Sequence, residues 1–91
     1  MYHTKFQEKV FEKPITLGTT LGRWAIFHQI PVTKIAKAIG ATRQSIYNWM
    51  HGGEVFVAYR PAVVHVIDCM KSSTTADEAW RKICQEFNLT T

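Results

Sequence analysis

The sequence predicts an all-α fold, a compact bundle of about five helices. Along most of the chain, apolar residues recur at spacings of three and four, as on one face of a helix. Prolines and glycines separate these periodic stretches. With 91 residues, 46% of them hydrophobic, the chain is long enough to bury one modest core. We therefore expect an N-terminal segment at residues 1–13 and a single domain at residues 14–91.

The N-terminal segment alternates charged residues with Phe6, Val10 and Phe11. Phe6 and Val10 are one helical turn apart, which fits a short helix, and an extended arm fits equally well. Pro14 closes the segment because the residue before a proline is disfavoured in the helical region.

The first core helix is predicted from Thr19 or Thr20, where a threonine can cap the start, to Gln29. Gly22 weakens this helix by about 1 kcal/mol relative to alanine, so tertiary contacts must support it. Pro31 fits the first turn of the next helix. The inward-facing residues are Leu21, Trp24, Ala25 and His28.

Two short helices are predicted next, over residues 32–39 and 43–50, within a motif spanning 32–52. Ala36 is small enough for two helices to cross closely, and Gly40 allows the positive φ of a sharp turn. Thr42 is the expected N-cap of the second helix. Ile46 and Trp49 are expected to hold that helix against the core.

The remaining chain is predicted to contain two more helices. Residues 54–58 are rich in β-branched and aromatic side chains, which fits a short edge strand or an extended linker. A helix follows over 60–71, and another over 75–88. Thr75 and Glu78 form a capping-box pattern at the start of the last helix.

The net charge of +4 is concentrated in one stretch of the sequence. Residues 23–60 contain five basic side chains and a single acidic one, and the rest of the chain is balanced. An excess localised in this way is typical of a surface that contacts phosphates. The basic residues are Arg23, Lys34, Lys37, Arg43 and Arg60.

The segment IAKAIGATRQSIYNWMHGG resembles the helix-turn-helix of the Cro-like and repressor-like phage regulators. The all-helical members are the closer resemblance, because this chain returns to helices after the motif. The resemblance implies that the helix over 43–50 enters the major groove of double-stranded DNA. It implies base contacts by Arg43, Gln44 and Asn48, with Tyr47 beside them. The implied phosphate contacts are Thr33, Lys34, Lys37, Thr42, Ser45 and Arg60.

The chemistry of these side chains suits base recognition. Arginine can bond to both major-groove acceptors of guanine, and glutamine or asparagine to the donor–acceptor pair of adenine. Each such pairing discriminates by about 1–3 kcal/mol. Gln44 and Asn48 are one turn apart, so both can reach the same groove.

Other classes of function find little support in the sequence. Cys69 and Cys84 are isolated, which fits a reduced protein without a cysteine metal site. His28 is expected to be a hydrogen-bonded core residue, and His65 has no second metal ligand one turn away. No nucleophile with its base and no phosphate-cradling glycine loop is recognisable, so we expect neither an enzyme nor a cofactor. No membrane segment or secretory signal is recognisable either, and we expect a cytoplasmic protein.

The expected function is therefore sequence-specific DNA-binding transcriptional regulation, as in a phage or prophage repressor. One reading helix contacts about four base pairs, so we expect a homodimer on an operator. Its interface would be residues 54–59 as a strand edge or the last two helices. Phe87, Leu89 and the apolar stripe of the helix over 60–71 slightly favour the helical surface. Two alternatives remain: an excisionase-type protein that bends DNA, and a helix-turn-helix scaffold used for protein contact, such as an antirepressor or antitoxin.

Overall fold

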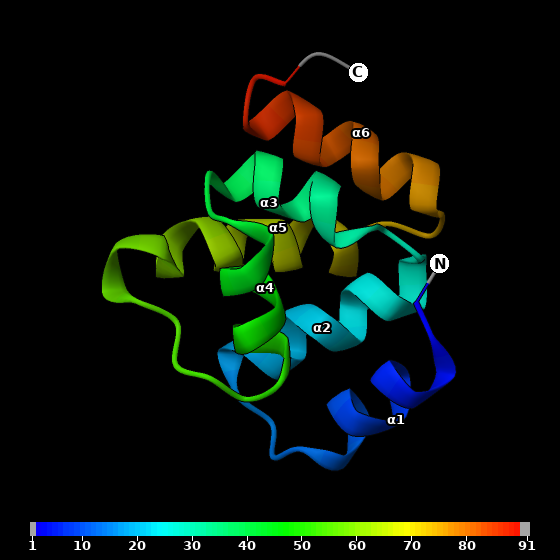
Figure 1. Cartoon of the computed structure of the whole chain (residues 1–91). Coiled ribbons are helices and arrows are strands. Elements are labelled where there is room, and N and C mark those ends of the chain that lie inside the picture. The colour runs from blue at the N-terminus through cyan, green and yellow to red at the C-terminus, as the bar shows by residue number, and fades with distance from the viewer. Residues whose placement is uncertain (1, 90–91) are drawn as a thin grey trace.

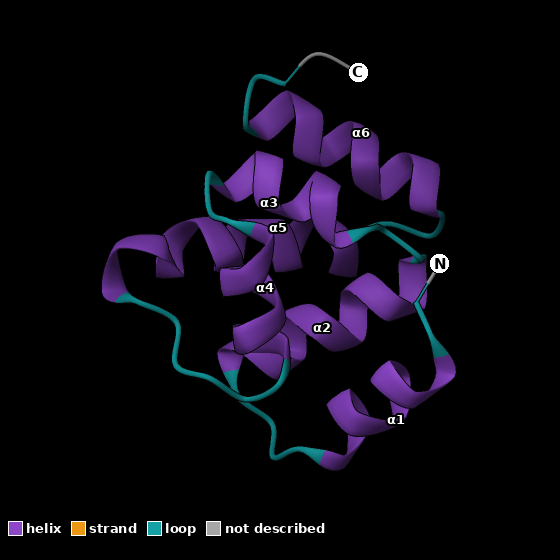
Figure 2. Cartoon of the chain, viewed as in Figure 1, coloured by secondary structure: helices purple, strands orange, loops and turns teal. Residues whose placement is uncertain are grey.

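A computed structural model describes residues 2–89 of the chain and contains six α-helices in that range (Figures 1 and 2). The all-α prediction is confirmed, with six helices rather than about five. Within residues 2–89 there is no strand. The helices are α1 (Thr4–Glu12), α2 (Leu17–His28), α3 (Val32–Ile39), α4 (Arg43–Met50), α5 (Arg60–Lys71) and α6 (Ala76–Glu86), and a short 3-10 turn, η1, spans Val57–Tyr59.

The core lies where α2 and α5 pack against each other. α5 also contacts α3 and α6, and α2 also contacts α1 and α4. Figure 1 shows α3 and α6 on one side of this central pair, α1 on the other, and α4 crossing in front. The largest fully buried side chains come from five helices, α2 to α6, and include Leu21, Ile35, Ile46, Met50, Met70 and Ile83.

The first helix of the prediction starts earlier than expected. Thr16, rather than Thr19 or Thr20, is the N-cap of α2: its hydroxyl accepts the Thr19 N–H at 3.2 Å. The Thr19 hydroxyl accepts the Thr16 N–H at 2.7 Å in return, so the two threonines cap the helix reciprocally. At the other end Gln29 lies outside the helix, in a left-handed conformation with φ 57°.

Two glycines let α2 approach α4 closely. A Cβ on Gly18 would overlap the Trp49 carbonyl oxygen and lie 2.9 Å from the Trp49 Cβ. A Cβ on Gly22 would lie 3.1 Å from side-chain atoms of both Met50 and Val10. Gly22 weakens the isolated helix, but in the folded chain its lack of a side chain makes room for α4 and α1.

The bounds of α3 and α4 agree with the prediction. The Thr42 hydroxyl accepts the Ser45 N–H at 3.1 Å and caps α4. Gly40 has φ 82°, and no atom lies within 4 Å of where its Cβ would be. The turn therefore requires glycine for its backbone conformation and not because of crowding. Ala36 is buried, as its place between helices predicts.

Residues 54–58 form neither a strand nor a sheet edge. The Arg60 Nε donates to the Val55 carbonyl at 3.0 Å, and its Nη2 lies 3.3 Å from a Glu54 carboxylate oxygen. These contacts fold the segment back onto the first residue of α5, where no partner strand is available. Phe56 and Val57 are left 72% exposed. The edge-strand interpretation was wrong because it rested on side-chain propensity alone.

The last helix is capped by Thr75, whose hydroxyl accepts the Glu78 N–H at 3.1 Å. The reciprocal half of the predicted capping box is displaced by one residue, since the Glu78 carboxylate accepts from the N–H of Thr74 at 2.7 Å. Hydrogen bonds from Thr74 hold the pKa of Glu78 below its usual value. The helix ends at Glu86, two residues before the predicted Asn88.

The N-terminal segment forms a helix, α1, rather than an extended arm. Its start is capped by His3, whose Nδ1 accepts the Lys5 N–H at 3.1 Å. Its end is held by Arg23 of α2, whose Nη2 donates to the carbonyls of Phe11 and Lys13 at 3.2 and 3.3 Å. A cation from α2 therefore binds the carbonyl end of α1, where the helix dipole favours positive charge.

Candidate functional site

The outer face of α4 carries the four residues predicted to contact bases. Ile46, Trp49 and Met50 are buried on the opposite face, which fixes the side of the helix that meets solvent. The exposed residues are Arg43, Gln44, Tyr47 and Asn48. No acidic residue lies in α4, so this face offers guanidinium, amide and hydroxyl groups without a carboxylate.

Gln44 and Asn48 bond to each other on this face. The Gln44 Nε2 donates to the Asn48 Oδ1 at 3.0 Å. The pair keeps the Gln44 carbonyl oxygen as an acceptor and the Asn48 amide as a donor for a further partner. One acceptor and one donor held in a fixed relation match the kind of pattern that a base edge presents.

A hollow lies beside this face, between the first turns of α3 and α4. Its volume is about 500 Å³. No side chain caps the start of α3, and its first turn contains no acidic residue. Amide groups at an uncapped helix start attract anions, and Arg43 adds a cation at the same hollow. The residues around it are Pro31, Val32, Thr33, Thr42, Arg43, Gln44 and Tyr47.

The structure brings together only part of the predicted phosphate-contacting set. Thr33 and Thr42 line the hollow. The Thr42 hydroxyl also donates to the Ser45 hydroxyl at 3.0 Å, and Ser45 is half-buried, so both residues serve the helix cap. Lys37 is exposed on α3.

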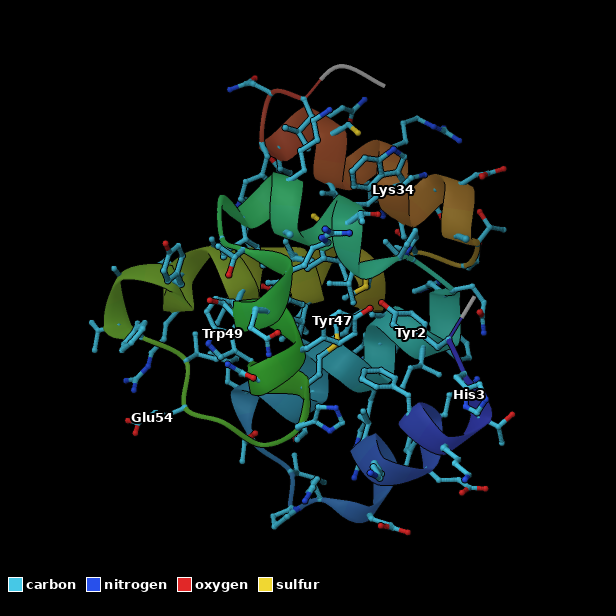
Figure 3. The ribbon with its side chains drawn as sticks, in the orientation of Figure 1. Tyr2, His3, Lys34, Tyr47, Trp49 and Glu54 are labelled. Carbon is cyan, nitrogen blue, oxygen red and sulfur yellow. The ribbon has the colours of Figure 1, made fainter. Side chains whose placement is uncertain are left out.

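Two basic residues of the set point elsewhere. The Lys34 ammonium lies 4.9 Å from the centroid of the Trp80 ring, a cation–π contact between α3 and α6 (Figure 3). Arg60 binds Glu54 and lines hollows formed by the 52–57 segment, away from the start of α3. Together with Arg23, which holds the end of α1, these residues show that the basic stretch of sequence does not form one basic face.

Sequence reasoning missed an aromatic cluster that joins α1 to α4. The Phe6 ring meets the rings of Tyr47 and His51 edge-on, with centroids 5.6 and 5.1 Å away. Tyr2 stacks on Phe6 at 5.3 Å, and its hydroxyl donates to the Ile30 carbonyl at 2.6 Å. Figure 3 shows Tyr2 beside Tyr47. Burial, and secondarily Tyr47, raises the pKa of Tyr2, so the phenol stays a donor. The four-residue spacing of Tyr2, Phe6 and Val10 could have indicated that these side chains share one helical face that packs against the domain.

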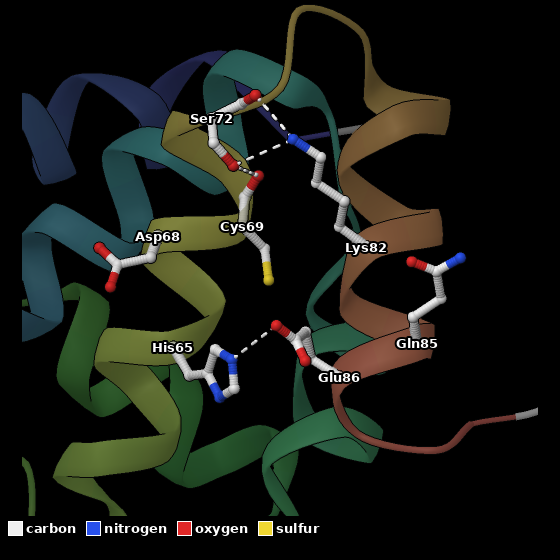
Figure 4. A pocket seen from close by; sticks show the side chains of 7 residues that line it. All are labelled: His65, Asp68, Cys69, Ser72, Lys82, Gln85 and Glu86. Atoms are coloured by element: carbon white, nitrogen blue, oxygen red, sulfur yellow. Dashed lines mark hydrogen bonds and ion pairs between the residues drawn. The ribbon is translucent and has the colours of Figure 1, made fainter.

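A second hollow, of about 520 Å³, lies between α5 and α6 (Figure 4). The Glu86 carboxylate lies 3.3 Å from the His65 Nε2, and the Lys82 ammonium donates to the Ser72 carbonyl at 2.8 Å. Burial, then the neighbouring Glu86 carboxylate, raises the pKa of the Cys69 thiol. A protonated, buried thiol is a poor nucleophile, so this hollow lacks the chemistry of a cysteine active site.

Other predicted side chains behave as core residues. His28 is buried, and its Nε2 bonds to the Met70 carbonyl at 2.8 Å. Cys69 and Cys84 are both buried and free. Over residues 2–89, no group of three or more histidine, cysteine or acidic side chains could hold a metal ion. In the same range, no helix has the length and apolar character that a membrane crossing requires.

Comparison with known proteins identifies no relative. No family model, no curated protein and no solved structure matches this chain.

Proposed function

We propose that this protein is a sequence-specific regulator that binds double-stranded DNA by inserting the start of α4 into the major groove. The observation that carries the proposal is the outer face of α4, which presents Arg43 and the Gln44–Asn48 pair beside the uncapped start of α3. A face rich in donors and free of acids suits the base edges and phosphates of a duplex.

In this proposal each side chain has a distinct task. Arg43 bonds to guanine, and the Gln44–Asn48 pair presents its remaining acceptor and donor to an adjacent base. Tyr47 contributes the exposed part of its ring, since 39% of the residue is exposed while Phe6 covers one edge. The first amides of α3 and the Thr33 hydroxyl bind a phosphate at the hollow.

The basic residues contribute unequally. Lys37 is exposed and can reach phosphate directly, whereas Lys34 must leave the Trp80 ring to do so. A cation–π contact like that between Lys34 and Trp80 is worth about 0.5–1 kcal/mol at an exposed site, so a phosphate can compete with the ring for the ammonium group. Arg60 already has a carboxylate partner, and we assign it to the fold of the 54–59 segment instead.

A dimer follows from the small number of base pairs that one helix reads. The apolar stripe of α5, namely Val63, Val66, Ile67 and Met70, is buried within the chain and cannot serve as the interface. Phe87 and Leu89 pack partly buried against the core. We therefore favour the exposed Phe56 and Val57 as the dimer contact. The dimer would act as a phage or prophage repressor in a bacterial cytoplasm.

The test is selection of bound duplexes from a random pool, followed by binding at several salt concentrations. We expect a recurrent, two-fold symmetric site and an affinity that falls steeply with salt. Arg43→Ala and Gln44→Ala should each lose about 1–3 kcal/mol of discrimination at particular positions of the site. Lys71→Ala, which removes an exposed charge from the end of α5, is the control.

The outcome also separates the alternatives. Compact symmetric protection of the duplex supports a repressor, while phased, extended protection with a large bend would support an excisionase-type protein. A chain that binds no duplex at any salt concentration would contradict the proposal and favour a scaffold for protein contact.

A further inference from the structure

We propose that α1 forms part of the same DNA interface, with Lys9 and Lys13 binding phosphates beside the last turn of α4. This inference rests on the proposed function and extends it to a helix that the sequence left outside the domain. The N-terminal segment contains three lysines and two glutamates, and the fold decides which of them lie near α4.

α1 packs on α2 and touches α4 near the end of that helix. Tyr2 lies just before α1, and its hydroxyl donates to the carbonyl of Ile30, two residues before α3 begins. Phe6 then contacts Tyr47 and His51, one turn apart on α4. At the other end, the Lys13 side chain passes 3.9 Å from the position of a Cβ on Gly52, just beyond α4. Phe6 and Lys13 therefore place α1 beside the last turn of α4 and the residue that follows it.

Lys9 is the lysine of α1 that lies closest to the side of the helix facing α4. Phe11 marks the side toward α2, because its ring centroid lies 5.1 Å from the guanidinium carbon of Arg23. At 3.6 residues per turn, Lys9 and Lys5 lie about 60° and 100° from Phe6 in the direction away from Phe11. Both are exposed.

The acidic residues of α1 lie farther round the helix. Glu8 and Glu12 are about 160° and 120° from Phe6, so they point away from α4. Lys9 therefore lies nearer to Phe6 than either carboxylate, whereas Lys5 lies about 20° from Glu12 on the helical wheel. Because Arg23 and the Tyr2–Phe6 contacts already fix α1, little ordering would be needed when DNA binds.

The test compares two double variants with the same loss of charge. Lys9→Ala/Lys13→Ala removes the proposed contacts, and Lys71→Ala/Arg81→Ala removes two exposed charges from α5 and α6. Affinity for a duplex selected with the unmodified protein, and for a scrambled duplex, is measured by fluorescence anisotropy over a range of salt concentrations. Circular dichroism confirms that both variants keep the helical fold.

We expect the α1 variant to bind both duplexes more weakly and to reduce the slope of log affinity against log salt by about 0.9 per lysine. The ratio between the two duplexes should stay constant, because phosphate contacts carry no sequence information. The control should keep the slope of the unmodified protein.

The failures are distinguishable. If the unmodified protein binds DNA and Arg43→Ala weakens recognition, while the α1 variant behaves like the control, α1 lies outside the interface and only this inference is overturned. If the unmodified protein binds neither duplex, the proposed function itself is wrong, and this inference falls with it.

Discussion

The two faces of α4 differ in how strongly packing constrains their residues. The inner face is constrained at every position: Ile46 is fully buried, Trp49 and Met50 are buried beside it, and Gly18 lets the backbones meet. The outer face contributes to the fold mainly through Tyr47, since Gln44 and Asn48 bond only to each other among the described contacts. The comparison shows that the fold fixes the position and orientation of α4 but does not require particular residues on its outer face.

The largest effect should come from removing the central inner side chain. Ile46→Ala leaves a cavity against α2 and should lower the free energy of unfolding by about 3 kcal/mol. Chemical denaturation followed by circular dichroism measures it. Val64→Ala, at a position of α5 that is 44% exposed, should change the value by less than about 0.5 kcal/mol. A comparable loss of free energy of unfolding in both variants would contradict the difference between buried and exposed positions.

The next effect tests the close approach of α2 and α4. Gly18→Ala places a methyl group against the Trp49 carbonyl, where backbone must move, and should destabilise by about 2–3 kcal/mol. Gly22→Ala is the matched control. Its methyl group would lie 3.1 Å from side-chain atoms of Met50 and Val10 rather than against backbone, and alanine favours the helix by about 1 kcal/mol, so a smaller loss is expected. Equal melting temperatures for both variants would show that the crossing is looser than described.

A smaller effect is expected at the turn before α4. Gly40→Ala should cost about 1 kcal/mol, because alanine is strained at φ 82° although nothing would touch its Cβ. Gly40→Asn should cost less, since asparagine tolerates the left-handed region. Thermal unfolding of both variants distinguishes backbone strain from crowding. If crowding were the cause, the larger asparagine would lower the melting temperature more than alanine does.

The smallest change in stability should come from the outer face. Gln44→Ala/Asn48→Ala removes one exposed hydrogen bond and should alter the free energy of unfolding by no more than about 0.5 kcal/mol. The same variant should lose DNA discrimination if the proposed function is right. A destabilisation near that of Ile46→Ala would show that these amides serve the fold.

The parts of the fold that sequence predicted well are those set by local chemistry. The bounds of α3 and α4, the Thr42 cap and the Gly40 turn each depend on a few adjacent residues. Features set by distant contacts were missed. Gly22 is explained only by Met50 of α4 and Val10 of α1. The fold of residues 54–58 depends on a closer contact, from Arg60 to the Val55 carbonyl, that side-chain propensity does not reveal.

The candidate site divides in the same way. Helical periodicity identified the outward residues of α4, because the buried Ile46 and Trp49 define the opposite side. The partners of the basic residues could not be predicted. Lys34 contacts Trp80, which is far along the chain, and Phe6 contacts Tyr47 because α1 packs on α2. Sequence therefore indicated which residues face outward on one helix, but not which helices share that surface.

The contact between Gly18 and the Trp49 carbonyl has a consequence for engineering. It positions the end of α4 through main-chain atoms, which stay the same whatever side chains the helix carries outside. A combinatorial library randomised at Arg43, Gln44 and Asn48 should therefore yield mostly folded members that display new chemistry at an unchanged angle. The same arrangement would let natural variants change the outer residues of α4 without compensating changes in the interior.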